Sequence, residues 1–516
     1  MVKLLRPCVF GLAIVLSACT TLPEDPARSR SQVAAPSVAG ELSAAASAVR
    51  AEIADGESAF LLIPKASEAM LWRQALIDSA VQSIDIQYFI WKDDASGSLL
   101  MEHLMAAADR GVRVRLLVDD MFLSTGGAFD GADQALAAVD YHPGIELRLF
   151  NPGKYRSGIL GLSGNFGLDL KTYNRRMHNK LMLVDGHFAI LGGRNIGDEY
   201  FGLHEPYNFL DLDVLVAGVT VGEVGAAFDE YWNADLAYPA AALGDADQSD
   251  LQEFRLQNSE YVQENNDRLG AYVNHGGDWS QRLQALPSQM QPGYGVFLQD
   301  EPVTRGEREF RLYDMLDDMV TPGNRELIIS TPYLIPVGPF LDHLEEDVSA
   351  GVEVRILTNS LASNDATPAH SHYKKYRPQI LATGASLFEL HHQPEGGLRD
   401  LTDHSPNVGG FVGLHVKASA VDSQRCFIGS LNIDPRSVKL NTENGLYIES
   451  DETCDELQRF LGSLVKYERA WSVTQDEAGK LKWTSFEGTT DSQPAQGSGQ
   501  RMADFFFRML PVESQL

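Results

Sequence analysis

Apolar and polar positions alternate with two periods from residue 67 onward, and the period changes repeatedly between helical and strand-like. Ser67 is expected to cap a helix. The apolar face of this helix consists of Leu71, Ala75, Leu76 and Ala80. Apolar runs predict strands at 84–91, 112–118 and 145–150, with a helix at 98–110 closed by Gly111. Two further strands, 181–184 and 188–191, flank a tight turn. Such alternation predicts a layered α/β fold with helices on both faces of the sheet.

The second half of the chain repeats this order of elements. Leu327 corresponds to Ile84, Gly351 to Gly111 and His415 to His178, at separations of 243, 240 and 237 residues. Generic α/β periodicity would not keep the separation so constant, so we infer that one unit has been duplicated. We expect an N-terminal half at 51–240 and a C-terminal half at 303–475. The polar segment 241–302 between them is interpreted as an inter-repeat excursion with at most short helices, with a lid as the alternative.

Each half contains one copy of the same polar motif. A His is followed two residues on by Lys, seven on by Asp, fourteen on by Gly and seventeen on by Asn. The copies are His178, Lys180, Asp185, Gly192 and Asn195, and His415, Lys417, Asp422, Gly429 and Asn432. A single match could be a polar strand edge without chemistry, but two matches with the same offsets argue against that interpretation.

These residue types suit chemistry at phosphorus. Residues two apart in a strand share a face, so each His projects together with its Lys. Imidazole can act as nucleophile or acid near neutral pH, and Lys and Asn donate hydrogen bonds to phosphate oxygens. Two copies facing each other would support two-step transfer through a covalent phosphohistidine, with the second His protonating the leaving oxygen. Lys and Asn supply the electrostatics that metals provide elsewhere, so we expect neither a metal nor a cofactor.

The doubled motif resembles that of the phospholipase D superfamily. The flanking segments are similar to the bacterial cardiolipin synthase branch, class C type, and the similarity runs from about residue 61 to 471 and returns at the C-terminal LPVESQL. The segments that carry it are IDIQYFIWKDDASGSLL, RGVRVRLLVDD, RRMHNKLMLVDG, GGRNIGDEYF and DLDVLVAG. The resemblance implies a duplicated phospholipase D fold, in which two α/β/α halves are related by a pseudo-twofold axis with the active site between them. It favours His178 as nucleophile and His415 as acid and base, although pseudo-symmetry leaves the reverse order open.

The other motif residues receive supporting roles. Lys180, Lys417, Asn195 and Asn432 are expected to hold the phosphate oxygens. Asp185 and Asp422 belong to the motif, but their odd spacing from His points them away, so we interpret them as partners for backbone or Arg. Ser430 replaces the Gly193 of the first copy and could donate a hydroxyl to substrate.

Two carboxylates are candidates for orienting the histidines. Glu443 lies 28 residues after His415, where the family carries an orienting carboxylate. Asp211 lies 33 residues after His178 and begins the equivalent strand. Its longer spacing leaves a solvated surface carboxylate as the alternative.

The N-terminus has the features of a targeting segment. Residues 1–18 carry Lys3 and Arg6 before an apolar run, which is typical of a signal peptide and too short to span a bilayer. The sequence LSAC ending at Cys19 resembles a bacterial lipobox, which implies lipidation of that cysteine; plain secretion is the alternative. Residues 19–50, rich in Ala, Ser and Pro, are interpreted as a flexible tether. We therefore expect a lipid-anchored protein of the cell envelope, outside the cytoplasm, on the inner or outer membrane.

Three features of the remaining sequence leave alternatives open. Cys426 and Cys454 could form a disulfide or remain two buried thiols. The tail 476–516 ends in an apolar segment around Phe505, Phe506 and Phe507, which either docks on the body or touches lipid. The apolar, Gly-rich residues 157–170 form either a loop for the membrane surface or a buried connection.

The net charge of −29 counts against a nucleic-acid substrate, since such binders use Lys and Arg. The leading hypothesis is phosphatidyl transfer at a membrane surface. It makes cardiolipin from phosphatidylglycerol and a second lipid, either phosphatidylglycerol or phosphatidylethanolamine. A hydrolytic phospholipase D is the second hypothesis, ahead of a secreted nuclease and a non-catalytic lipoprotein. The sequence reveals no accessory protein.

Overall fold

The computed structural model describes residues 22–23, 26–121, 129–154, 165, 173–274, 277–302, 312, 319–321 and 323–515. The expected signal peptide, the candidate lipidation site Cys19 and nearly all of the loop predicted at 157–170 lie outside these residues. Within the described part of the chain, no helix combines the length and apolar character needed to cross a bilayer.

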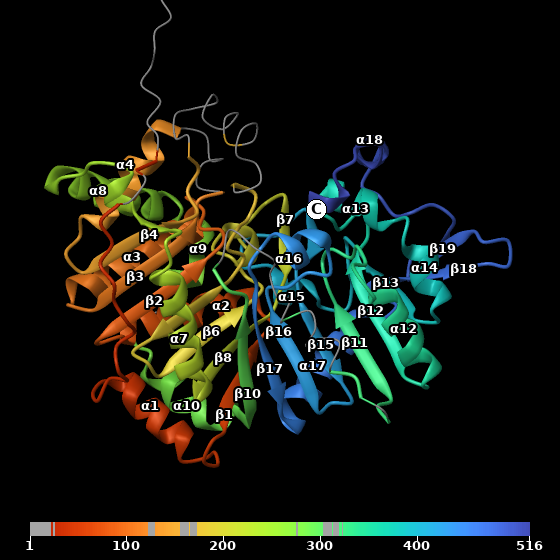
Figure 1. The fold of residues 1–516 in the computed structure, drawn as a ribbon, viewed down its shortest axis with the longest axis horizontal. Coiled ribbons are helices and arrows are strands. Elements are labelled where there is room, and N and C mark those ends of the chain that lie inside the picture. Colours follow the sequence, from red (N-terminus) through yellow and green to blue (C-terminus); the bar gives the residue numbers. More distant parts are fainter. Residues whose placement is uncertain are drawn as a thin grey trace, which may run out of the picture.

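The N-terminal half is a sheet flanked by helices (Figure 1). Its strands are β1 (Ser58–Ile63), β2 (Ser83–Tyr88), β3 (Arg113–Asp119), β4 (Ile145–Phe150), β5 (Leu181–Val184), β6 (Phe188–Gly192), β8 (Asp213–Gly218) and β9 (Ala237–Pro239). Its helices are α1 (Glu41–Arg50), α2 (Ala66–Ser79), α3 (Ala95–Asp109), α4 (Phe129–Asp140) and α7 (Thr220–Trp232). The helices α8 (Gln248–Glu264), α9 (Asn266–Leu269) and α10 (Ser280–Gln289) follow.

The C-terminal half has the same design. Its strands are β10 (Gln291–Gln299), β11 (Glu326–Ser330), β12 (Glu353–Asn359), β13 (Ser386–Leu390), β15 (Ala418–Val421), β16 (Arg425–Gly429), β17 (Asn444–Glu449), β18 (Ala470–Gln475), β19 (Leu481–Ser485) and β20 (Gly488–Thr490). Its helices are α12 (Phe340–Ser349), α13 (Thr367–Tyr373), α14 (Arg377–Ala382), α15 (Arg399–Thr402), α16 (Pro435–Lys439), α17 (Asp451–Leu464) and α18 (Ser498–Arg508).

Strand order shows that the two halves are copies of one unit. The first half runs β9-β4-β3-β2-β5-β6-β8-β1, and the second runs β18-β13-β12-β11-β15-β16-β17-β10. The halves meet where β1 pairs antiparallel with β10, Ser58 opposite Gly293. The predicted duplicated α/β fold is therefore confirmed, with the pseudo-twofold relation between its halves.

Three apolar clusters form the core. One lies between α1, α2, α3 and the N-terminal strands, and another lies between α12, α14 and the C-terminal strands. The third combines α7 and α17 with strands of both halves, and Phe228, Trp232 and Leu457 are among its buried members. Because this cluster crosses the boundary, the halves are packed as one body and hold their facing edges in a fixed relation.

The prediction of a flexible tether at residues 19–50 is wrong for residues 26–50, because these residues pack on the body of the protein. Arg28 Nε donates to the carbonyl of Ala237 at 3.2 Å, and the Val33 amide donates to an Asp229 carboxylate oxygen at 2.9 Å. Helix α1 buries Leu42 and Val49. The Ala-rich composition that indicated a coil is also that of a good helix former, and the helix gains stability from its packed face.

Other boundaries also need correction. The segment 241–302 contains α8, a helix of 17 residues, rather than at most short helices. Only Leu251 and Val262 of α8 are buried, so its sequence lacks a strong apolar period. Strand β10 belongs to the second repeat, which thus begins before 303, and β19 and β20 extend the sheet beyond 475. Helix α2 begins at Ala66, one residue before the expected cap Ser67.

Cys426 of β16 and Cys454 of α17 form a disulfide with a Cα–Cα distance of 5.4 Å. This finding decides between the bridge and the two free thiols that the sequence left open.

Candidate active site

Two short parallel pairings between the halves position the two motif histidines. Strand β14 (Phe411–Leu414) pairs in parallel with β7 (Tyr207–Leu210), and Met177 bridges Thr442 in the same sense. In each pairing, the next residue of one segment is a motif histidine, and the next residue of the other segment carries a carboxylate. The His178 amide donates to the Thr442 carbonyl at 2.8 Å, and the His415 amide donates to the Leu210 carbonyl at 2.8 Å. This register places each histidine beside the carboxylate of the other half.

Each imidazole is held by that carboxylate. His178 Nδ1 lies 2.6 Å from Glu443 Oε2, and His415 Nδ1 lies 2.6 Å from Asp211 Oδ2. The sequence analysis located each carboxylate by its distance along the chain from the histidine of its own half. In the structure, each carboxylate instead contacts the histidine of the other half. A proton on Nδ1, donated to the carboxylate, leaves the lone pair of a neutral imidazole on Nε2. This tautomer is the one that a nucleophile or general base at Nε2 requires.

Burial dominates the electrostatics of these pairs. It raises the pKa of Glu443 to about 7 and that of Asp211 to about 6, against the opposing effect of the neighbouring lysines. Burial, followed by repulsion from Lys180 and Lys417, lowers the pKa of both histidines well below 6.5. These surroundings favour neutral imidazoles.

The lysine of each motif is buried and donates to the backbone carbonyl of its own histidine. Lys180 Nζ donates to the His178 carbonyl at 2.6 Å, and Lys417 Nζ donates to the His415 carbonyl at 2.7 Å. Each bond uses one of the three hydrogens that an ammonium group carries. Burial lowers the pKa of Lys180 to about 7 and that of Lys417 to about 8. An incoming phosphate anion would favour the charged form of both lysines.

The motif asparagines are both buried but differ in their partners. Asn195 Nδ2 donates to the Tyr200 hydroxyl at 2.8 Å, and Asn195 Oδ1 accepts from the Ile90 amide at 3.2 Å. The side-chain oxygen of Asn432 has no hydrogen-bond partner among the described residues. Their role as donors to phosphate oxygens remains a prediction.

Ser430 does not have the substrate-binding role expected from the sequence. Its fully buried hydroxyl donates to Glu443 Oε2 at 2.5 Å and accepts from the Asn444 amide at 3.0 Å. The hydroxyl therefore fixes the carboxylate that holds His178. In the other half, a Cβ on Gly193 would lie 2.1 Å from Asp211 Oδ1, so glycine is required there. Ser430 with Glu443 and Gly193 with Asp211 are thus matched pairs.

The motif aspartates lie away from the histidines, in agreement with strand parity. Asp185 Oδ1 accepts from the Gln82 and Ser83 amides at 2.8 Å each, which ties the β5–β6 turn to β2. Asp422 Oδ1 accepts from the Glu326 amide at 2.8 Å at the equivalent place. Both aspartates have left-handed backbone, with φ of 52° and 50°. They hold the hairpin that begins after each His and Lys.

Sequence reasoning missed the aromatic rings around the histidines. Phe89 contacts His178 edge-on at a centroid distance of 4.8 Å. Tyr200 and Phe209 contact His415 at 5.2 and 4.9 Å. Phe89 and Tyr200 stand in the segments that carry the family resemblance, but periodicity alone does not reveal which ring meets which imidazole. The rings exclude water from the imidazoles and restrict their rotation.

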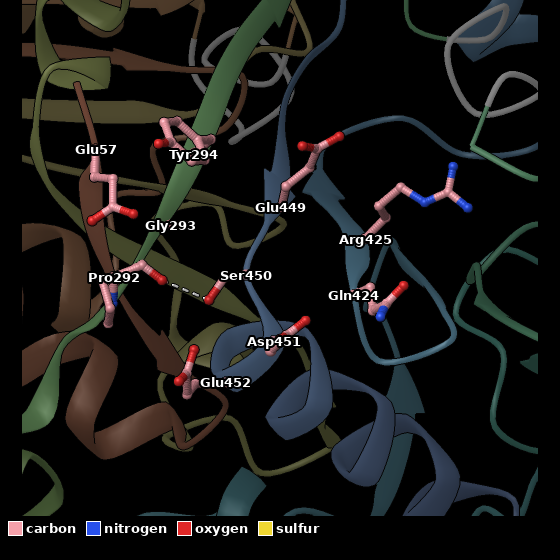
Figure 2. A pocket seen from close by; sticks show the side chains of 10 residues that line it. All are labelled: Glu57, Pro292, Gly293, Tyr294, Gln424, Arg425, Glu449, Ser450, Asp451 and Glu452. Carbon is pink, nitrogen blue, oxygen red and sulfur yellow. Dashed lines mark hydrogen bonds between the residues drawn. The ribbon is translucent and has the colours of Figure 1, made fainter. Parts of the chain in front are cut away.

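A polar hollow of about 460 Å³ lies elsewhere, between β10, β17 and the start of α17 (Figure 2). Ser450 Oγ donates there to the Pro292 carbonyl at 2.7 Å, and Glu57, Glu449 and Asp451 line the walls. The hollow is at the far end of β17 from Glu443, about 20 Å along the strand. Its carboxylates would repel a phosphate, so it is not part of the site.

Comparison with known proteins identifies the fold and the family. The family model "Cardiolipin synthase, PLD-like domain" matches residues 74–232 and 318–465, one match in each repeat. Cardiolipin synthase C of Escherichia coli (strain K12) is 36% identical over 478 residues, covering 89% of this chain and 96% of that protein. A cardiolipin synthase of Clostridium perfringens (strain SM101 / Type A) is 27% identical over 384 residues, covering 73% of this chain and 63% of that protein.

A solved structure supports the same fold. The phosphatidylserine synthase of Haemophilus influenzae Rd KW20 superimposes with a TM-score of 0.57 at 14% sequence identity, covering 91% of this chain and all of that chain. The repeated family match, the identity to cardiolipin synthase C and the paired His and Lys motifs lead to one conclusion: the chain belongs to the phospholipase D-like cardiolipin synthase family of phosphatidyltransferases.

Proposed function

We propose that the protein makes cardiolipin by moving a phosphatidyl group from a donor phospholipid to a head-group hydroxyl of phosphatidylglycerol, through a phosphohistidine on His178. The donor is phosphatidylglycerol or phosphatidylethanolamine. The observation that supports this most strongly is the crossed pair of histidines, each held at Nδ1 by a carboxylate of the opposite half at 2.6 Å. Two such imidazoles beside two lysines fit a nucleophile and an acid acting on one phosphodiester.

In the first step, the Nε2 lone pair of His178 attacks phosphorus and the bond from phosphorus to the departing alkoxide breaks. His415 gives its Nε2 proton to that oxygen, so the head group leaves as a free alcohol: glycerol from phosphatidylglycerol, or ethanolamine from phosphatidylethanolamine. This requires a protonated His415 in the complex, although its pKa is lowered well below 6.5 when the site is empty. The negative phosphate and the Asp211 carboxylate both favour the imidazolium once substrate is bound.

In the second step, neutral His415 removes the proton from a head-group hydroxyl of the acceptor phosphatidylglycerol. That oxygen attacks the phosphohistidine, and the bond from phosphorus to His178 Nε2 breaks. One phosphate ester has replaced another, and both histidines have returned to their starting states. Lys180 and Lys417 stabilise the negative charge on the phosphoryl oxygens in both transition states.

Hydrolysis is the alternative outcome, because water could take the place of the second hydroxyl at the same site. Mixed vesicles containing phosphatidylglycerol labelled in its diester phosphate distinguish the two reactions. We expect labelled cardiolipin, and its loss in the His178→Ala and His415→Ala variants. Labelled phosphatidic acid without cardiolipin would refute the synthase and support the hydrolase.

We further propose that the protein is a lipid-anchored envelope protein modified at Cys19, on the basis of the lipobox-like LSAC. Cells fed an alkyne-tagged fatty acid should yield tagged protein, and the tag should disappear in Cys19→Ala. Tagging that survives this substitution would contradict the assignment.

A further inference from the structure

Helix α18 is amphipathic, but its polar face rather than its apolar face is turned toward the protein. Asp504 is 2% exposed and forms an ion pair with Lys374 of the α13 region at 2.5 Å. Gln493 also donates to Asp504, at 3.0 Å. Gln500, one turn earlier, donates to the Leu361 carbonyl at 2.6 Å. Polar contacts therefore fix this helix on the body, which answers the question of whether the tail docks.

The apolar residues of α18 point away from the body. Met502, Phe505, Phe506 and Met509 are 72%, 64%, 55% and 62% exposed. Their spacing of three and four residues places them in one arc of the helix surface. A helix stabilised only by packing on the protein core would bury these side chains. Because they are exposed, this arc can contact an apolar partner outside the protein.

Two arginines border this arc. Arg501 and Arg508 are both exposed and stand seven residues apart, which aligns them along one edge of the apolar residues. The chain as a whole carries −29, and the only acidic residue of this helix is the ion-paired Asp504. The exposed charged side chains of the helix itself are therefore both positive, on an acidic protein.

The position of α18 connects it with the active site. After the helix, the chain passes over α13 and α14, where Glu513 accepts from the Tyr376 hydroxyl at 2.7 Å. It then reaches Gln515, which accepts from Asn174 at 2.6 Å and from Arg436 at 3.2 Å. The charge of Arg436 contributes to the lowered pKa of His178. Seven residues separate Arg508 from Gln515, a span of at most about 25 Å. In Figure 1, α18 stands at the top edge and the C-terminus lies near α16.

We propose that α18 is a membrane-docking helix, whose apolar arc enters the surface of a bilayer while Arg501 and Arg508 bind anionic head groups. The inference rests on the proposed function for its choice of a lipid partner, since a phosphatidyltransferase must reach lipids in a membrane. A basic edge beside exposed Phe and Met side chains is the composition of interfacial helices. A second copy of the chain is a poorer occupant, because four side chains on an 11-residue helix fall short of a stable interface of about 800 Å² per partner.

Photo-crosslinking tests the contact directly and without activity. In the full chain carrying His178→Ala, a benzoylphenylalanine replaces Phe505, or replaces Tyr467 as the matched control on a surface loop outside α18. Tyr467 is 53% exposed, close to the value for Phe505. The proteins are irradiated on vesicles of phosphatidylcholine with a minority of radiolabelled phosphatidylglycerol. We expect the Phe505 probe to capture at least about fivefold more labelled lipid than the Tyr467 probe, because it lies inside the acyl boundary.

Equal capture at the two positions would overturn the proposal. A crosslinked band of twice the chain mass from the Phe505 probe, without labelled lipid, would assign the arc to a second copy instead. Adding Arg501→Gln and Arg508→Gln should reduce the captured label by about threefold or more, as expected for two head-group contacts. Unchanged capture would refute the role of the arginines.

Activity provides the second test in the chain with both histidines intact. The double variant Phe505→Ser, Phe506→Ser should lose about tenfold or more of its turnover on vesicles yet keep its turnover on detergent-dispersed phosphatidylglycerol, where docking is unnecessary. Equal losses in both assays would contradict a docking role. Because crosslinking uses an inactive chain, a failure of the proposed chemistry would not affect its outcome.

Discussion

The two active-site halves differ most at the residue that touches the orienting carboxylate. Ser430 supports Glu443, whereas Gly193 leaves room for the shorter Asp211. The pseudo-symmetric site therefore has two unequal imidazoles. Among the described residues, a side-chain hydroxyl donates to the Glu443 carboxylate in addition to its histidine, and none donates to the Asp211 carboxylate. This asymmetry predicts which substitutions shift the acid limb of the pH profile of kcat/KM.

The Ser430→Ala variant should shift the acid limb of kcat/KM toward higher pH. The hydroxyl favours ionised Glu443, so its loss raises the pKa of that carboxyl further above its present value of about 7. The reactive form needs Glu443 ionised to accept from His178 Nδ1, so activity at pH 7 should fall about tenfold and partly recover at higher pH. The buried Ser58, whose hydroxyl bonds Thr220, provides the control Ser58→Ala, which should leave the limb in place. An unshifted limb in Ser430→Ala would refute the role of the hydroxyl.

The Lys180→Met variant should be inactive but more stable at pH 7. The folded-state pKa of Lys180, about 7, lies below its usual 10.5, so folding disfavours the charged ammonium. This cost in the free energy of folding is absent above the pKa of Lys180 in the unfolded chain, 10.5, and it grows as the pH falls from there to about 7. Replacing the ammonium should raise the free energy of unfolding by about 2 kcal/mol. Lys480→Met, at an exposed pair, should change it little. A lower Tm for Lys180→Met in thermal unfolding would contradict the burial argument.

At the scale of elements, the site depends on the two parallel pairings that cross between the halves. Gly202, in the turn before β7, has φ of 77°, and a Cβ there would lie 2.5 Å from the His404 amide nitrogen. Contact between this turn and the segment that leads to β14 sets the register of His415 on Asp211. The turn is therefore a structural support for the active site from outside it.

Gly202→Ala should destabilise the fold by about 3 kcal/mol and reduce kcat, because the methyl group forces the two segments apart. Gly351 has a similar φ of 94° but no atom within 4 Å of its Cβ position. Gly351→Ala should therefore cost about 1 kcal/mol, the backbone strain alone, and leave kcat unchanged. Denaturant unfolding of both variants measures the difference. Equal costs would show that the crossing contact contributes nothing.

The sequence predicted the elements best where a repeat or a strong period was present. Strands 145–150 and 181–184 agree with β4 and β5, and the doubled motif located both histidines and both orienting carboxylates. It could not reveal that Glu443 serves His178 and Asp211 serves His415, because that exchange arises from pairing between segments more than 200 residues apart. The role of Ser430 was missed for the same reason.

At the scale of the whole molecule, composition was the weakest guide. Ala-rich residues 41–50 and the polar residues 248–264 gave no clear apolar face, yet both are helices that pack on the body. The net charge of −29 is spread over a protein whose active site contains two buried lysines and whose α18 exposes two arginines. Local charge, rather than the total, is what a phosphodiester substrate meets.

The central proposal is that His178 of the crossed pairs is the covalent nucleophile and that His415 is its acid and base. The most direct measurement is rapid quench at alkaline pH after mixing with phosphatidylglycerol labelled in its diester phosphate, followed by peptide mapping. The account predicts label on the peptide containing His178 in the unaltered protein, and none in His178→Ala. Label that persists in His178→Ala, or that maps to His415, would contradict it.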